Sequence, residues 1–349
     1  MLAEVRRFDL LLVALLALPL SSARAEVGLT QITGGEDTGP VTIFYPSSGV
    51  ARTVERGPFT FRLAEEGTPQ RGNGRLVVVS HGSGGSPWVN ADLARTLVEA
   101  GFVVAMPEHH ADNFKDASEP GPDSWKRRPK EVSNAIDKVA GDPRFAPLLE
   151  LDRVGVYGMS AGGHTALTLA GGRWSPLRLR EHCDAHIAED FQACVGLTTQ
   201  LDGGLLDGAK KTIAVWVIRM RFDDPTWYSY EDPRVAAAVA GVPFAADFDP
   251  ASLSAPRVPL ALVTARRDEW LVPRFHSDPI LEACSGCKLI ADLPTGGHGA
   301  LLSPPPPLVS GLVGELLSDP PGFDRTQIVE VDKAIADFFV EHLVDGPPS

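Results

Sequence analysis

A serine flanked by small residues is the feature of this sequence best suited to covalent chemistry. Ser160 stands in Gly158-Met159-Ser160-Ala161-Gly162, directly after the apolar run 154–157 and before a segment of helical character, 161–170. A G-x-S-x-G pattern between a strand and a helix is typical of a nucleophile elbow, a strained turn that lifts the serine hydroxyl above the strand ends. The sequence therefore predicts Ser160 as a nucleophile. A helix-capping serine in a nucleotide-binding turn is the alternative.

The general base that such a serine needs is predicted to be His298. It lies in Gly296-Gly297-His298-Gly299 near the C-terminus, where glycines allow a loop to carry the imidazole over the elbow. Its late position agrees with the order serine, acid, histidine that accompanies this kind of elbow. His276 and His342 fit less well, because one precedes the last predicted strand and the other lies in the final helix.

The acid that orients the base is expected directly after the apolar run 260–264. Asp268 is the first acidic residue there, and Glu269 follows it. The sequence predicts Asp268 as the acid, with Glu269 as the second choice. In the alternative interpretation, both carboxylates are exposed partners of Arg266 and Arg267.

A glycine-rich turn supplies a candidate oxyanion hole. Ser80-His81-Gly82-Ser83-Gly84-Gly85 follows the β-branched run 76–80. Such a turn can aim backbone N–H groups at a developing oxyanion, and we predict that those of Ser83 and Ala161 do so. His81 is predicted to have a local structural role. A phosphate-binding loop is the alternative, but the Lys-Ser/Thr ending typical of such loops is missing.

Other histidines are interpreted as structural. His109, His110 and Asp112 could suggest a metal site, but their spacing is tight for a shared ion and no third cluster accompanies them. We expect them to pack against the glycine-rich turn 80–85, here called the oxyanion loop, and we predict no metal and no cofactor. His164, four residues after the serine, is predicted to be a packed core residue.

Two tryptophans lie next to these motifs. Trp88 follows the glycine-rich turn, and Trp270 follows the predicted acid. We predict that both line the pocket for the acyl group, and filling of the core is the alternative for each.

Strand-like and helix-like segments alternate along the chain. Predicted strands cover 41–45, 59–63, 76–80, 102–106, 154–157, 235–242, 260–264 and 288–292, and predicted helices cover 91–100, 129–139, 161–170 and 327–343. This alternation predicts an α/β fold, a doubly wound and mostly parallel sheet with helices on both faces. Residues 171–232 break the rhythm and are predicted to be an insertion after the nucleophile helix.

One helix prediction depends on a proline. Pro129 is expected near the first turn of the helix 129–139, where its missing N–H is tolerated. The basic residues 126–130 are accordingly expected to form the solvated start of that helix.

The N-terminal residues indicate export. Arg6 and Arg7 precede the apolar run 10–20, and Ala23-Arg24-Ala25 fits a signal-peptidase site, so residues 1–25 are predicted to be a signal peptide. An uncleaved membrane anchor is the alternative. We expect a periplasmic or secreted protein with no stable membrane anchor after cleavage.

The four cysteines fit this expectation. Cys183 and Cys194 form one couple, and Cys284 and Cys287 form a C-x-x-C. An even number in an oxidising compartment favours two disulfides, and pairing within each couple is the simplest of the three connectivities.

Composition limits the classes of function. The chain has 349 residues, 44% of them hydrophobic, and a formal net charge of -13. It carries no basic cluster of the kind that binds nucleic acid, so no nucleic-acid partner is expected. No linker divides the sequence, and residues 26–349 are predicted to be one catalytic domain.

The motifs together resemble a known branch of the α/β-hydrolases, the bacterial dienelactone-hydrolase-like and platelet-activating-factor acetylhydrolase-like enzymes. The segments that carry the resemblance are 40–46, 79–85, 105–109, Arg128-Pro129, the elbow 158–163 continuing to 167, 232–235 and His298. The resemblance implies hydrolysis of esters of short or oxidised acyl groups without a metal. True dienelactone hydrolases have a cysteine nucleophile where this chain has Ser160.

These observations predict a serine hydrolase that cleaves carboxylic esters of short acyl groups through an acyl-enzyme. The expected partner is a small-molecule ester. A peptidase or amidase with the same triad, and a non-catalytic binding protein on a hydrolase scaffold, are the alternatives.

Overall fold

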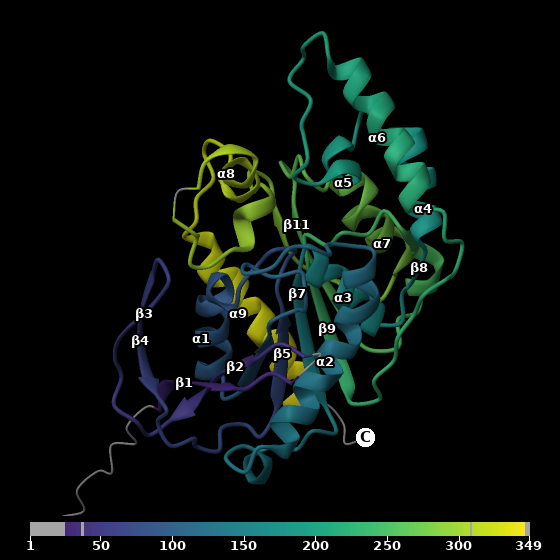
Figure 1. The fold of residues 1–349 in the computed structure, drawn as a ribbon. Helices are drawn as coiled ribbons and strands as arrows, with labels where there is room; N and C mark the ends of the chain where they lie inside the picture. The colour runs from purple at the N-terminus through teal and green to yellow at the C-terminus, as the bar shows by residue number, and fades with distance from the viewer. Residues whose placement is uncertain (1–24, 36–37, 308, 346–349) are drawn as a thin grey trace, which may run out of the picture.

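A single twisted sheet organises the molecule. The computed structural model describes residues 25–35, 38–307 and 309–345 (Figure 1). Within these ranges, ten strands form one sheet in the order β12-β11-β9-β7-β5-β6-β2-β1-β4-β3. Their bounds are β1 Glu26–Ile32, β2 Val41–Ser47, β3 Arg52–Arg56, β4 Phe59–Glu65, β5 Leu76–Ser80, β6 Val103–Pro107, β7 Val154–Met159, β9 Val235–Gly241, β11 Leu260–Ala265 and β12 Lys288–Leu293. The predicted signal peptide lies outside the described residues, apart from Ala25.

The central strands are parallel. Strands β12, β11, β9, β7, β5 and β6 pair in parallel, whereas β2 joins β6 and β1 joins β2 in antiparallel pairs. Both faces of this region are covered. In β5, Leu76 and Val78 belong to one hydrophobic core, and Val77 and Val79 belong to the other. The doubly wound, mostly parallel sheet predicted from the sequence is therefore present.

Helices cover the two faces of the sheet. One face carries α1 (Ala91–Glu99) and α9 (Gln327–Phe339), and the other carries α2 (Asp123–Gly141) and α3 (Ala161–Leu169) (Figure 1). Shorter helices are α7 (Ser277–Ala283), after β11, and α8 (Gly311–Leu317), before α9. No helix among the described residues is both long enough and apolar enough to cross a membrane.

Helices make up about half of the segment between α3 and β9. It contains the short strand β8 (Arg173–Trp174), then α4 (Pro176–His186), α5 (Phe191–Val195) and α6 (Asp207–Arg221). Strand β8 pairs with β10 (Phe248–Asp249) outside the main sheet. These helices gather at one end of the molecule, and α6 projects away from the sheet (Figure 1).

Both couples of cysteines are joined. The disulfide Cys183–Cys194 links α4 to α5, and Cys284–Cys287 closes the turn between α7 and β12. The chain has four cysteines, and none of them is free.

The start of α2 differs from the prediction. The helix begins at Asp123, so Pro129 lies inside it and, having no N–H, cannot donate to the Trp125 carbonyl four residues before it. The predicted solvated start at residues 126–130 is wrong, because Arg128 in this stretch is completely buried. A buried arginine needs a partner for its guanidinium, and here the partner is Asp112, which precedes the helix.

Candidate active site

The turn that holds Ser160 has the backbone geometry of a nucleophile elbow. Ser160 lies between β7 and α3 with φ 57° and ψ -118°, a conformation that costs a non-glycine residue free energy. Its N–H donates to the Gly241 carbonyl at 3.0 Å, and its carbonyl accepts from the N–H groups of His164 and Phe244. These backbone bonds hold the strained residue in place.

Two glycines make this turn sterically possible. A Cβ at Gly158 would lie 1.9 Å from the Gly162 carbonyl oxygen, and a Cβ at Gly162 would lie 1.9 Å from the Ser80 carbonyl oxygen. A side chain at Gly158 would therefore force β7 and α3 apart, and one at Gly162 would force the elbow away from β5. The glycines of the motif are required because β7, α3 and β5 pack at backbone contact.

The three predicted members of the triad meet in space. The Ser160 hydroxyl donates to Nε2 of His298 at 3.0 Å, and Nδ1–H of His298 donates to Oδ2 of Asp268 at 2.7 Å. His298 and Asp268 are buried, with 6% and 3% of their surface exposed, whereas Ser160 is partly accessible. A hydroxyl bonded to a buried and oriented imidazole can lose its proton to that imidazole as it attacks.

The loop after β11 distinguishes the two candidate acids. Oδ1 of Asp268 accepts the backbone N–H groups of Trp270 and Leu271, both at 2.8 Å, which leaves Oδ2 for His298. Glu269 is exposed. The surface pairing considered as an alternative does not occur for Asp268, because Arg266 pairs with Asp278 and Asp292 instead.

The glycine-rich turn after β5 lies directly against the elbow. A Cβ at Gly82 would be 3.4 Å from the Cβ of Ser160. Within the described part of the chain, the backbone N–H groups of Ser83 and Ala161 have no hydrogen-bond acceptor. Ala161 also begins α3, whose N-terminus carries a partial positive charge. Two such donors beside a nucleophile can stabilise a negatively charged oxygen.

A buried ion pair lies behind this turn. Asp112 and Arg128 are both 0% exposed, and Nη2 of Arg128 donates to Oδ2 of Asp112 at 2.8 Å. Burial would raise the pKa of the Asp112 carboxyl, but the charge of Arg128 and hydrogen bonds from Ser124 and Ser83 lower it to about 2. Sequence reasoning anticipated that Asp112 packs against the loop but missed Arg128.

His109 belongs to a second buried array. Its Nε2 accepts the Ser80 hydroxyl at 2.8 Å, and its Nδ1–H donates to Oε2 of Glu131 at 2.6 Å. The serine–histidine–acid order imitates a triad, but Ser80 and His109 are fully buried. Burial, together with the charge of Arg128, keeps the pKa of His109 below its ordinary value. This array fixes the end of β5 and is closed to substrate.

The remaining histidines considered in the sequence have structural contacts. His164 is buried among Trp125, Trp174 and Phe248, and its Nε2 donates to Asp247 at 3.1 Å. No group of three or more His, Cys, Asp or Glu residues in the described ranges is arranged to hold a metal. His110 is exposed while His109 is buried, so the two adjacent rings do not face a common point.

The two tryptophans differ in their surroundings. The Trp88 ring packs against Phe44 and Phe61, at centroid distances of 6.5 and 6.0 Å, and under the Arg56 guanidinium. These contacts account for Trp88 as part of the hydrophobic core beside β2 and β4. Trp270 is half-buried next to Asp268, to which its backbone N–H donates.

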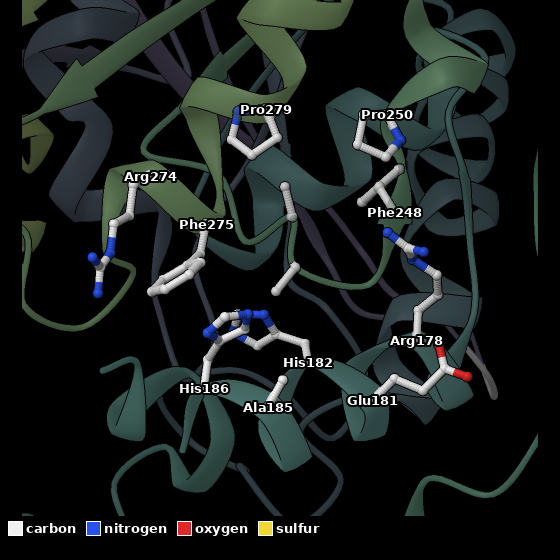
Figure 2. A pocket seen from close by; sticks show the side chains of 12 residues that line it. Arg178, Glu181, His182, Ala185, His186, Phe248, Pro250, Arg274, Phe275 and Pro279 are labelled. Atoms are coloured by element: carbon white, nitrogen blue, oxygen red, sulfur yellow. The ribbon is translucent and has the colours of Figure 1, made fainter. Parts of the chain in front are cut away.

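A separate cavity of about 280 Å³ lies between α4 and the segments that follow β9 and β11 (Figure 2). His182 and His186 of α4 point into it side by side, and Phe275 faces them (Figure 2). Neither Ser160 nor His298 lines this cavity. It is therefore not the space in which Ser160 would attack a substrate.

A buried carboxylate connects this region to the loop that carries Asp268. Asp190 accepts Nε2–H groups from His182 at 2.8 Å and His276 at 3.0 Å, and it also accepts the N–H of Val272. Nδ1 of His276 in turn accepts the N–H of Ala245. His276 thus has a complete set of structural partners away from Ser160.

Comparison with known proteins places the fold. No protein-family model matches the chain, and no curated protein matches it by sequence. Among solved structures, the chain is similar to a ferulic acid esterase from Streptomyces cinnamoneus, with a TM-score of 0.59 and 19% identity over 95% of this chain and 94% of the other. A likeness at this identity establishes architecture, and chemistry has to be argued from the residues of the site. The chain has the α/β-hydrolase fold.

Proposed function

We propose that this protein is a serine hydrolase that cleaves carboxylic esters of short acyl groups. The observation that carries the proposal is the continuous hydrogen-bonded line from the Ser160 hydroxyl through His298 to Asp268, at 3.0 and 2.7 Å, on a strained elbow. Each of the three side chains has the environment that its role requires. The oxyanion loop beside Ser160 adds the electrostatic component.

The proposed reaction proceeds through an acyl-enzyme. Ser160 Oγ attacks the ester carbonyl carbon while its proton passes to Nε2 of His298, and the carbonyl oxygen becomes an oxyanion bound by the N–H groups of Ser83 and Ala161. Collapse of this intermediate breaks the bond to the alcohol, which leaves with the proton from His298. Water then attacks the acyl-serine by the same route and releases the acid.

Asp268 contributes by holding His298. Its Oδ2 accepts Nδ1–H, so the imidazole presents an unprotonated Nε2 to the serine, and its charge stabilises the imidazolium that forms. The two backbone N–H groups on Oδ1 prevent the carboxylate from rotating away. Asp268 is not itself protonated in the cycle.

The proposed subfamily and the proposed acyl pocket follow from the resemblance noted in the sequence. We place the chain with the dienelactone-hydrolase-like and platelet-activating-factor acetylhydrolase-like serine esterases, and we propose Trp270 as a wall of the acyl pocket. Trp88 was predicted to share this role, but its ring contacts are with the core.

Export is the second part of the proposal. Two disulfides favour an oxidising compartment, and β1 begins at Glu26, directly after the predicted cleavage site. We propose that residues 26–349 are the mature protein, a single periplasmic or secreted catalytic domain.

A panel of substrates tests the activity. We expect hydrolysis of p-nitrophenyl acetate and butyrate, a decline with longer acyl chains, and little cleavage of the matching p-nitroanilides. Methyl ferulate belongs in the panel because the similar solved structure is named for ferulate esters.

The matched variants are Ser160→Ala and Ser254→Ala, the latter an exposed serine in a surface turn. Ser160→Ala should lower turnover by up to about a millionfold and Ser254→Ala should not lower it. Activity of Ser160→Ala within about tenfold of wild type would exclude the proposed nucleophile, and preferential cleavage of anilides would favour an amidase.

A further inference from the structure

The peptide between Gly82 and Ser83 is held through its carbonyl group. The Gly82 carbonyl oxygen accepts three donors: Nδ1–H of His81 at 2.7 Å, the N–H of Gly85 at 3.0 Å and Nη2 of Arg128 at 3.4 Å. A trans peptide is planar, so its C=O and N–H point in opposite directions. Fixing the Gly82 carbonyl therefore fixes the direction of the Ser83 N–H.

Arg128 holds the loop at further points. Its Nη1 donates to the His81 carbonyl at 2.5 Å, and its Nε and Nη2 donate to Oδ2 of Asp112 at 3.2 and 2.8 Å. All three guanidinium nitrogens are thus committed to the loop or to Asp112. A planar donor fork of this kind cannot be replaced by a single ammonium group.

Asp112 holds the part of the loop that follows the Gly82–Ser83 peptide. Its Oδ1 accepts the Ser83 hydroxyl at 2.5 Å and the Gly84 N–H at 3.0 Å. Gly84 has φ +63°, so the loop turns sharply there, and the aspartate bond fixes that turn. Together, Arg128 and Asp112 determine the orientation of the peptide planes on both sides of Ser83.

The burial of this pair argues for a positional role. Both side chains are 0% exposed. Removing two charges from water is costly, and a well-packed apolar pair would often be at least as stable. An apolar pair, however, could not bind two carbonyls and one N–H of the glycine-rich turn, as Arg128 and Asp112 do.

We propose that Arg128, acting with Asp112, is the positioning residue of the oxyanion hole: it fixes the Gly82–Ser83 peptide so that the Ser83 N–H points at the oxyanion formed on Ser160. The inference rests on the proposed function. A cationic donor on the Gly82 carbonyl also polarises that peptide and makes its N–H a stronger donor. Arg128 touches neither the substrate nor the reacting atoms.

The test compares Arg128→Lys, Asp112→Asn and Ser83→Ala with Arg127→Lys. Arg127 is the neighbouring residue on α2, has a side chain 33% exposed and pairs with Glu119, so it serves as the matched control. Each variant is measured for kcat and KM on p-nitrophenyl acetate. Active sites are titrated with a fluorophosphonate, in which Ser160 Oγ bonds to phosphorus, fluoride leaves, and the serine proton passes to His298.

We expect Arg128→Lys and Asp112→Asn to lower kcat per titrated site by at least about 10-fold and at most about 1000-fold, since complete loss of one oxyanion donor costs about 100- to 1000-fold and a misdirected donor costs less. KM should stay within about threefold. The apparent pKa in the pH profile of kcat/KM should not move, because the contacts of His298 are untouched. The fluorophosphonate should react more slowly in the same proportion, because its phosphoryl oxygen occupies the same hole.

Ser83→Ala keeps the inference testable if the buried variants fail to fold. Ser83 is an exposed residue, so the fold should survive, and loss of one of the two bonds to Oδ1 should lower kcat by up to about tenfold. Arg127→Lys should match wild type.

The outcomes separate the two proposals. A merely structural role would reduce the number of titrated sites but leave kcat per site and the labelling rate at wild-type values, and that result overturns the inference alone. A wild-type protein that neither hydrolyses esters nor reacts with the fluorophosphonate overturns the proposed function and the inference with it.

Discussion

Asp268 shows how a single carboxylate can be fixed for one task. Its Oδ1 is occupied by two backbone N–H groups and its Oδ2 by His298, and the residue is buried. No rotation of the carboxylate could improve its bonding, so the imidazole has one tautomer and one orientation. Glu269, one residue later, is exposed and has no comparable contacts.

Substitutions of Asp268 and Glu269 should differ greatly in their effect on kcat. Asp268→Asn should lower kcat by several orders of magnitude, because an amide can present its N–H₂ to Nδ1, favour the wrong tautomer and fail to stabilise the imidazolium; about ten-thousandfold is the loss in the serine protease precedent. Glu269→Gln should cost little. The measurement is kcat on one ester for both variants. A crippled Glu269→Gln would move the acid by one residue while leaving the mechanism in place.

At the scale of elements, the elbow depends on backbone contact between β7, α3 and β5. We predict that Gly162→Ala destabilises the protein, since its Cβ would lie 1.9 Å from the Ser80 carbonyl oxygen and the backbone would have to move. Overpacking of this kind costs about 1–3 kcal/mol. Chemical denaturation measures the loss in the free energy of unfolding. Ester hydrolysis should also become slower, because Ser80 is the first residue of the oxyanion loop and would be displaced.

Gly141→Ala is the control for this prediction. Gly141 ends α2, and a Cβ there would meet nothing within 4 Å. The substitution should leave the free energy of unfolding unchanged or raise it by less than about 1 kcal/mol, because alanine favours helices. Equal effects of the two substitutions would mean that the close packing at the elbow is not a constraint.

The elements that could be predicted from the sequence are those with a strong local signal. The β-branched run of β5 and the elbow between β7 and α3 identify themselves by composition and spacing. Strand β3 was missed because it is polar, with only Val54 buried, as an edge strand can be. The helices between α3 and β9 have weak amphipathic periodicity, so only an insertion could be predicted there.

The start of helix α2 and the burial of Arg128 were not predicted from the local sequence. The start was misplaced because Pro129 was given its commonest position, and Arg128 was then taken as exposed. A pattern did point to the buried face: Arg128 is in step with Val132, Ile136 and Val139, all of which are buried. Its partner Asp112 lies outside the helix, so the pairing depends on tertiary structure.

At the scale of the whole molecule, the disulfides are the feature that bears on the proposed export. We predict that protein purified from the periplasm or the medium contains no reactive thiol when denatured without reductant, because all four cysteines are paired. After reduction, four thiols per chain should appear. Stoichiometric labelling before reduction would contradict the proposed oxidising location. Peptide mapping would identify any bond other than Cys183–Cys194 or Cys284–Cys287.

One buried acid, Asp332, should make the free energy of unfolding depend on pH. Asp332 of α9 is 5% exposed, and burial, together with the charge of Asp92 on α1, raises its pKa to about 8. Tyr157 of β7 is the other titratable group coupled to it, and burial together with the charge of Asp332 raises the pKa of that phenol too. Helices α9 and α1 cover the same face of the sheet, so Asp332 and Tyr157 lie within the hydrophobic core on that face.

The sign of the effect follows from the direction of the shift. In the unfolded chain an aspartate has an ordinary pKa of 3.8, whereas in the folded chain Asp332 keeps its proton up to about pH 8. Unfolding between these values releases a proton, so stability falls as pH rises from about 4 to about 8 and then levels off. Below about pH 4 both states are protonated and the cost disappears.

Asp332→Asn should therefore raise Tm, and the gain should be largest near pH 8 and smallest near pH 4, because the amide has no ionisation to suppress. Asp337→Asn on the same helix replaces an exposed carboxylate and should change Tm little at either pH. Thermal unfolding of wild type and both variants at the two pH values decides the matter. A Tm gain for Asp332→Asn that is the same at pH 4 and pH 8 would mean that the substitution acts through packing and not through the buried charge.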